Sequence, residues 1–159
     1  MNKLLIPAAL AAALALPASA LAATTATAQQ TFNVTVALTA VCSSTTSGTP
    51  AVAFGTYTAF GAAINNVAVS PGITFQCTRG LPTPTAAFDT GTAAGVVAGL
   101  QYTLSAPSGS KTTSGTAATS GTLGTADVYT YTFNGSIAGG QAGDSTASTT
   151  DVRQLIISY

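Results

Sequence analysis

The sequence predicts an all-β protein with the architecture of a β-sandwich, and two observations lead to this fold class. Beyond residue 22 the apolar residues fall in short runs that alternate with polar residues or are rich in β-branched side chains, and Gly, Pro, Asn and Ser separate these runs. The same region has no apolar stripe at the i, i+3, i+4 spacing of an amphipathic helix.

Residues 1–22 are typical of a secretory signal peptide. Lys3 provides the positive charge, residues 4–16 are almost wholly apolar, and Pro17 ends that run. Small residues offer two cleavage sites, Ala18-Ser19-Ala20 and Ala20-Leu21-Ala22, of which we favour cleavage after Ala22. The alternative, an uncleaved anchor, needs about 20 apolar residues to span a bilayer. We therefore expect a mature chain without a membrane span, made of an extension over residues 23–41 and one domain over residues 42–159.

Residues 31–38 are predicted to form the first strand. Phe32, Val34, Val36 and Leu38 alternate with polar or small residues, so one face of the strand is apolar throughout. The printed sequence also ends in a strand pattern, at Leu155-Ile156-Ile157-Ser158-Tyr159, and no further segment follows to pair with it. A detachable apolar strand at the front and an unpaired strand at the back favour polymerisation.

The intervening strands follow in order along the domain. They are predicted over residues 52–57, 66–69, 73–78, 86–89, 100–104, 129–133, 136–138 and 152–159. Within three of them, alternate large apolar residues share one face and make up the expected core: Ile73, Phe75 and Cys77; Leu100, Tyr102 and Leu104; Tyr129, Tyr131 and Phe133. Residues 105–126, nearly all Ser, Thr, Gly and Ala, predict a long surface loop or loose hairpin, and residues 139–150 a second such region.

The charge and composition exclude several classes of function. Without histidine there is no Ser–His or Cys–His pair, and all four acidic residues are Asp, so we expect no enzymatic activity and no catalytic residue. The mature chain has three basic residues, too few for a nucleic-acid-binding face. No metal site or cofactor is expected either, because Asp144 and Asp151 lack the alternate ligands of a calcium loop.

Cys42 and Cys77 are the only cysteines, and a secreted chain places them in an oxidising compartment. We predict that they form a disulfide, which closes a loop of 36 residues and stabilises the domain by roughly 4 kcal/mol on the chain-entropy account. The alternative, a metal site, lacks a histidine or a second cysteine pair to complete the ligand set.

Several of these segments together resemble the spore coat protein U domain, a family that includes the major pilins of archaic chaperone–usher pili. The resemblance is carried by Cys42 at the start of the first core strand, by the stretches at 52–57, 73–77 and 102–104, and by the alternating strand at the end. Residues 131–141 (YTFNGSIAGGQ) also resemble the family's penultimate strand and the turn that follows it. The resemblance covers nearly all of the mature chain.

The resemblance implies an immunoglobulin-like sandwich that lacks its last strand and therefore has an apolar groove. A periplasmic chaperone would fill this groove first, and an outer-membrane usher would then let the N-terminal strand of the next subunit replace it, so the partners would be identical or related pilins. The donor residues would be Phe32, Val34, Val36 and Leu38, and one groove wall would hold Leu155, Ile157 and Tyr159. The protein would pass through the periplasm to a pilus on the cell surface, with roles in adhesion and biofilm formation.

Two alternatives remain open at this point. Residues 31–38 could fold back as the first strand of their own domain and give a self-complete monomer. Such a protein would be a secreted spore-coat or matrix protein that does not polymerise by strand exchange. A carbohydrate-binding β-sandwich would need an exposed aromatic platform, for which Tyr57 and Phe60 are the candidates.

Overall fold

The computed structural model describes residues 28–159, and the chain divides into one unit up to Val36 and a compact unit over Ala37–Tyr159. The predicted signal peptide and both of its cleavage sites lie outside the described residues. All regular structure in the described part is β, with ten strands in antiparallel sheets, and no helix there could cross a membrane. The fold class predicted from the sequence is thus confirmed at the level of an all-β, sandwich-like protein.

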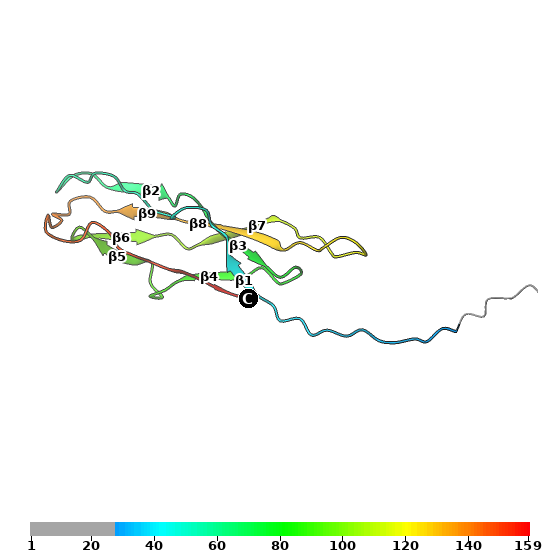
Figure 1. The fold of residues 1–159 in the computed structure, drawn as a ribbon. Helices are drawn as coiled ribbons and strands as arrows, with labels where there is room; N and C mark the ends of the chain where they lie inside the picture. Colours follow the sequence, from blue (N-terminus) through cyan, green and yellow to red (C-terminus); the bar gives the residue numbers. More distant parts are fainter. Residues whose placement is uncertain (1–27) are drawn as a thin grey trace, which may run out of the picture. The chain divides into compact units, whose positions relative to one another are not determined.

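The strands of the compact unit are as follows, and Figure 1 labels most of them. They are β1 (Cys42–Ser44), β2 (Ile64–Ala68), β3 (Ile73–Cys77), β4 (Thr85–Phe88), β5 (Ala94–Val97), β6 (Leu100–Leu104), β7 (Ser108–Thr113), β8 (Asp127–Thr132), β9 (Asn134–Ile137) and β10 (Leu155–Ser158).

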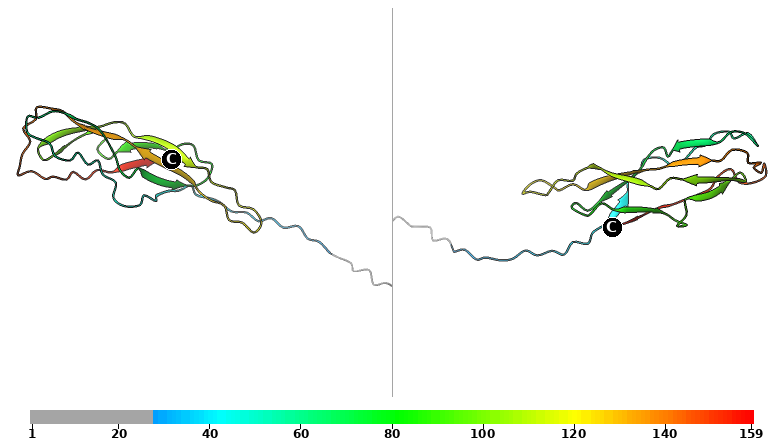
Figure 2. Two further views of the ribbon diagram at one scale, coloured as in Figure 1. Left: turned by 90° about the horizontal axis from the view of Figure 1, so that it is seen from above. Right: turned by 180° about the vertical axis from the view of Figure 1, so that it is seen from behind.

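A long two-stranded ribbon runs the length of this unit and joins its sheets. One chain of the ribbon is β6 followed by β7, and the other is β8 followed by β9, with Phe133 as the single residue between the last two. The half of the ribbon that contains β7 and β8 belongs to a sheet with the strand order β1-β3-β8-β7. The half that contains β6 and β9 belongs to a sheet with the order β2-β9-β6-β5. Figures 1 and 2 show these strands lying side by side in all three views. The ribbon therefore contributes side chains to the whole interior.

The remaining two strands, β10 and β4, form a separate pair. Leu155 lies opposite Phe88 and Ser158 opposite Thr85, and β10 has β4 as its only strand neighbour among the described residues. This pair packs against the inner face of the ribbon, because Phe88 and Leu155 belong to the same apolar cluster as Leu100, Tyr102 and Ile137.

The interior has two clusters, each built mainly from alternate residues of the ribbon and completed by one residue of a neighbouring strand. The first contains Phe88, Leu100, Tyr102, Leu104 and Ile137, and the second contains Cys77, Tyr129 and Tyr131. The core residues predicted on β6 and β8 are confirmed, although Phe133 and two of the predicted β3 residues, Ile73 and Phe75, are only half-buried.

The structure differs from the sequence predictions in one element and refines them in two others. Residues 52–57 are not a strand, and their stretch has only a single bridge from Ala51 to Ser70, because no neighbouring strand lies along it in the described part. β5 was not predicted, since its four residues alternate too briefly to stand out from the Gly-rich sequence around it. The polar region 105–126 is a hairpin, as one of the two expectations had it, but its first part is the regular strand β7.

Candidate functional site

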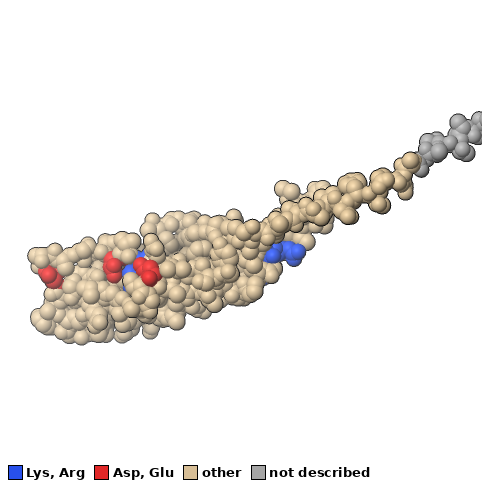
Figure 3. Space-filling model, turned by 90° about the horizontal axis from the view of Figure 1, so that it is seen from below, with Lys and Arg blue, Asp and Glu red and all other residues tan. Residues whose placement is uncertain are grey.

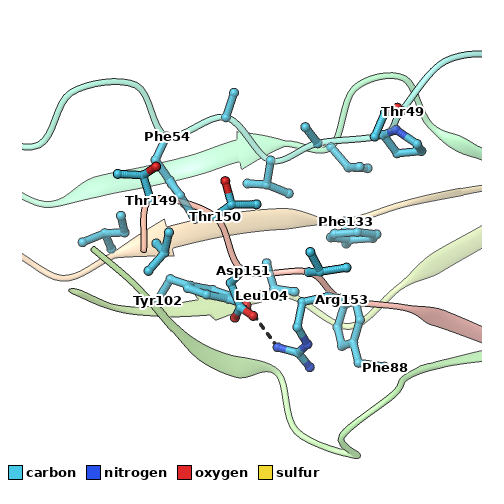
Figure 4. Close-up of a pocket in the computed structure, with 18 of the residues that line it drawn as sticks. Thr49, Phe54, Phe88, Tyr102, Leu104, Phe133, Thr149, Thr150, Asp151 and Arg153 are labelled. Atoms are coloured by element: carbon cyan, nitrogen blue, oxygen red, sulfur yellow. Dashed lines mark hydrogen bonds between the residues drawn. The ribbon is translucent and has the colours of Figure 1, made fainter. Parts of the chain in front are cut away.

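An apolar cavity of about 810 Å³ opens in the compact unit between two stretches that belong to no sheet. Residues 49–57 form one wall, and residues 149–154, which lead into Leu155 at the start of β10, form the other. Figure 4 shows Phe54 and Tyr102 directed toward the space between them. The interior side is lined by large apolar side chains of the first cluster, including Phe88, Leu100, Tyr102, Leu104, Phe133 and Ile137. A hollow lined by apolar side chains is a candidate binding site.

The first wall is an extended segment with the side-chain alternation of a strand. Pro50, Val52 and Phe54 are half-buried and face the interior, whereas Ala51 and Ala53 are exposed. Phe54 packs on Tyr102 with 5.9 Å between the ring centroids. Gly135 on β9 makes this approach possible, because a Cβ atom there would lie 2.6 Å from the Phe54 ring. The wall therefore keeps the alternation of a strand while lacking a ladder.

The second wall is held in place by polar side chains. The Tyr102 hydroxyl donates to the Asp151 carboxylate at 2.5 Å, and the Arg153 guanidinium donates to Asp89 at 2.9 Å and to the Thr92 carbonyl at 2.9 Å. Arg153 also lowers the pKa of the Asp89 carboxyl, while burial, assisted by the bond to Asp151, raises the pKa of Tyr102. These bonds hold residues 151–153 against β6 and the β4–β5 loop, so the wall is anchored without being part of a sheet.

One edge of β10 has no strand beside it in the described part of the chain. The Asp89 N–H donates to the Gln154 carbonyl, so by antiparallel alternation residues 154, 156 and 158 direct their backbone groups toward β4. The N–H and C=O groups of Leu155 and Ile157 then point the other way. This edge is therefore available for another strand.

β1 has the same arrangement on its outer edge. The Thr78 N–H donates to the Val41 carbonyl and the Thr45 N–H to the Thr74 carbonyl, which directs the backbone groups of Cys42 and Ser44 away from β3. Cys42 and Ile157 pack against the same cluster of Cys77, Tyr129 and Tyr131, so both open edges border the same part of the interior.

The predicted disulfide between Cys42 and Cys77 is confirmed. The two residues lie directly opposite each other on β1 and β3, with their Cα atoms 4.1 Å apart. The bond ties the short strand β1 to the sheet, and with it one edge of the interior.

The predicted donor residues lie in a stretch with no assigned strand. Residues 28–41 are without regular structure, and the side chains of Phe32, Val34, Val36 and Leu38 are 82%, 86%, 92% and 80% exposed. Their role as a donor strand stays a prediction.

The three residues predicted for the groove wall lie in different surroundings. Leu155 lines the cavity, Ile157 packs against the second cluster, and Tyr159 is 58% exposed. The contribution of Asp151 and Arg153 is not predictable from the sequence, since a pair of charges before a strand does not reveal its partners. The alternation of Val52 and Phe54 predicts a strand, whereas the structure has an extended segment without a ladder there.

The aromatic pair considered for a carbohydrate site does not form a platform. Tyr57 is half-buried, and its hydroxyl accepts a hydrogen bond from the Gln141 N–H at 3.0 Å, whereas Phe60 is 75% exposed. The expectation that both rings are exposed is therefore wrong for Tyr57. Among the described residues, no three His, Cys, Asp or Glu side chains lie close enough together to hold a metal ion.

No protein-family model, curated protein or solved structure matches this chain.

Proposed function

We propose that this protein is a structural pilus subunit, which polymerises by lending residues 32–38 as a strand to the groove of another copy. The observation that carries the proposal is the apolar cavity, one wall of which continues into β10, a strand with an open edge. By the resemblance to the spore coat protein U domain, a periplasmic chaperone would cover the groove first, and an outer-membrane usher would direct the exchange. Adhesion and biofilm formation at the cell surface belong to the same proposal.

The chemistry of the segment fits the chemistry of the groove. Residues 32–38 extend over about 20–24 Å as a strand, comparable with the length of a domain. Their four large apolar side chains lie on one face of such a strand and are mostly exposed in the single chain. Burying them contributes roughly 6–12 kcal/mol before the cost of ordering the segment. Backbone hydrogen bonds to Leu155 and Ile157 on the open edge would add to this, as in other cases of strand addition.

A contact of this kind produces a fibre. The donor surface of one copy, residues 32–38, differs from the acceptor surface, the groove. Every oligomer therefore has a free donor segment at one end and an unoccupied groove at the other. Growth therefore continues until the subunits are consumed. The low formal charge of the mature chain, three basic and four acidic residues, opposes this association very little.

The experiment compares the purified mature chain with two variants on gels run in detergent with and without heating. The wild type is expected to give a ladder that collapses to monomer on heating. Val34→Asp with Val36→Asp places two charges on the apolar face of the donor and should abolish the ladder. The matched control, Asn33→Asp with Thr35→Asp, places the same charges on the other face and should preserve the ladder.

A synthetic peptide of residues 31–39 gives a second measurement on the same full chain. Added in excess, it should occupy the groove and shorten the wild-type ladder. A wild type that runs as a monomer before and after heating, or a Val34→Asp, Val36→Asp variant that still forms the ladder, would contradict the proposal. The monomer result would favour the self-complete sandwich.

A further inference from the structure

The two ends of the compact unit are far apart and chemically different. The β8–β9 chain runs from Asp127 to Ile137, a distance of about 33 Å for a strand of this length. Cys77 pairs with Asp127 at its start, so the β3–β4 loop lies at this end, which we name the β1 end. Ile137 pairs with Ile64, so the β9–β10 loop follows at the opposite end, which we name the β9 end. Figure 1 shows these two loops on opposite sides.

Ion pairing leaves one basic and two acidic side chains of the described part without an ionic partner. Lys111 pairs with Asp127 at 2.7 Å and Arg153 with Asp89 at 2.9 Å, while Asp151 accepts the Tyr102 hydroxyl. Among the described residues, the exposed charged side chains without an ionic partner are then Arg79, Asp144 and Asp151, of which Asp151 is held by the neutral Tyr102 hydroxyl. Arg79 lies in the β3–β4 loop and Asp144 in the β9–β10 loop, and Figure 3 shows an acidic group at one end of the unit and a basic group toward the other.

At the β1 end, an exposed apolar residue and the free cation are both held near the start of the β3–β4 loop. Val41 is 53% exposed, and its backbone is fixed to Thr78 by three hydrogen bonds, 2.9 Å from the Thr78 N–H to the Val41 carbonyl, 3.0 Å from the Val41 N–H to the Thr78 hydroxyl and 3.3 Å from that hydroxyl to the Val41 carbonyl. Arg79 is the next residue after Thr78. Val41 and Arg79 therefore lie at the same end of the unit.

At the β9 end, the free carboxylate lies beside a small cavity. This cavity of about 220 Å³ is lined by Asp144 together with Ala59, Ala142 and Leu100. Asp144 is held there because its N–H donates to the Ala98 carbonyl at 2.8 Å and its Oδ1 accepts the Thr146 hydroxyl at 2.7 Å. Its Oδ2 has no hydrogen-bond partner within the described part of the chain and stays available.

The small cavity adjoins the groove. Tyr57, Ala98 and Leu100 line both, so the two hollows are neighbours at the β9 end. In the sequence, Val41 follows Leu38 by three residues, about 10 Å of extended chain. A copy whose Leu38 occupied the end of the groove could therefore bring Val41 to the cavity.

We propose that successive copies also dock end to end, with Val41 of one copy in the small cavity of the next and Arg79 paired with Asp144. This inference rests on the proposed function, since it places a second contact at each strand-exchange junction. The occupant is a second copy of this chain, because the charge and the apolar side chain at the β1 end complement those at the β9 end. The contact fixes the direction of the inserted strand and speeds its docking by charge attraction.

The test measures how fast the heat-sensitive ladder grows in charge-reversed variants of the full mature chain. Arg79→Asp and Asp144→Arg each place like charges at every junction, and each should slow growth about three- to tenfold at about 0.01 M salt. The double variant restores opposite charges and should return close to the wild-type rate. At about 1 M salt, where the Debye length is about 3 Å, all four chains should grow at similar rates.

Two controls separate this contact from general effects. Thr103 is exposed on the outer face of β6, between the two ends, so Thr103→Asp and Thr103→Arg change the net charge without touching either end and should leave the rate unchanged. Val41→Ser removes the apolar contact without altering charge and should slow growth to the same extent at both salt concentrations.

Each outcome bears on one of the two proposals. If the wild type forms no ladder, strand exchange itself is refuted. If the ladder forms at one rate in the wild type and both reversals, or if the double variant is slower than either single one, end-to-end docking is refuted while strand exchange stands. An unchanged rate for Val41→Ser would remove Val41 from the contact.

Discussion

Removing the disulfide is expected to destabilise the domain by about 4 kcal/mol and to loosen β1. Cys42 and Cys77 close a loop of 36 residues, for which the chain-entropy account gives about 4 kcal/mol. This is a large part of the 5–15 kcal/mol that stabilises an ordinary domain. β1 has only three residues and one strand neighbour in the described part, β3, so the loss should be greatest there.

The assay is urea unfolding of the double variant Cys42→Ala, Cys77→Ala, compared with the wild type before and after reduction. Reduced wild type keeps the sulfur atoms, so it isolates the effect of the cross-link from that of the small cavity at the buried Cys77. Hydrogen exchange should show the greatest loss of protection in residues 41–46. A change in unfolding free energy below about 1 kcal/mol in both samples would refute the reasoning, since the cross-link would then constrain nothing that the fold does not already constrain.

Three further predictions concern single side chains. The folded-state pKa of Asp127 is about 2 rather than 3.8, because the Lys111 ammonium and two backbone N–H groups stabilise its charged form. The contribution of Asp127 to folding stability is present above pH 3.8 and lost as the pH falls through about 2. Asp127→Asn should therefore reduce the difference between the urea midpoints at neutral and acid pH, and an unchanged difference would contradict this. Phe54→Ala should cost about 1–3 kcal/mol in urea unfolding, below the value for a fully buried ring because Phe54 is half-buried, and a neutral result would mean that this wall does not pack. Arg153→Met should accelerate hydrogen exchange in residues 149–155 while leaving β8 protected, and equal acceleration in both would indicate global destabilisation.

Several strands could be predicted from the sequence because their alternation records burial on one face. Leu100, Tyr102 and Leu104 are buried while the residues between them are exposed, as the period-2 pattern requires. β7 has no such record, because all six of its residues are exposed and its pairing comes from the neighbouring β8. Composition alone therefore indicated a loop or loose hairpin where the ribbon has a regular strand.

The candidate groove was harder to anticipate. The alternation of Val52 and Phe54 predicts a strand, but pairing depends on whether another strand lies alongside, and a sequence pattern does not contain that information. Likewise, Arg153 and Asp151 act through partners 49–64 residues away in the chain, on β6 and the β4–β5 loop. The disulfide could be predicted because only one pairing of two cysteines exists.

The central claim is that residues 32–38 occupy the groove of a different copy, and cross-linking between isotopically distinct chains tests it most directly. Copies labelled with ¹⁵N and carrying a photo-reactive phenylalanine analogue at Val34 are mixed with unlabelled wild type in denaturant, refolded, allowed to assemble and irradiated. We predict cross-links from the labelled Val34 position to groove residues such as Phe54 and Leu155 of unlabelled chains. Cross-links to those residues exclusively within the labelled chain would contradict the account.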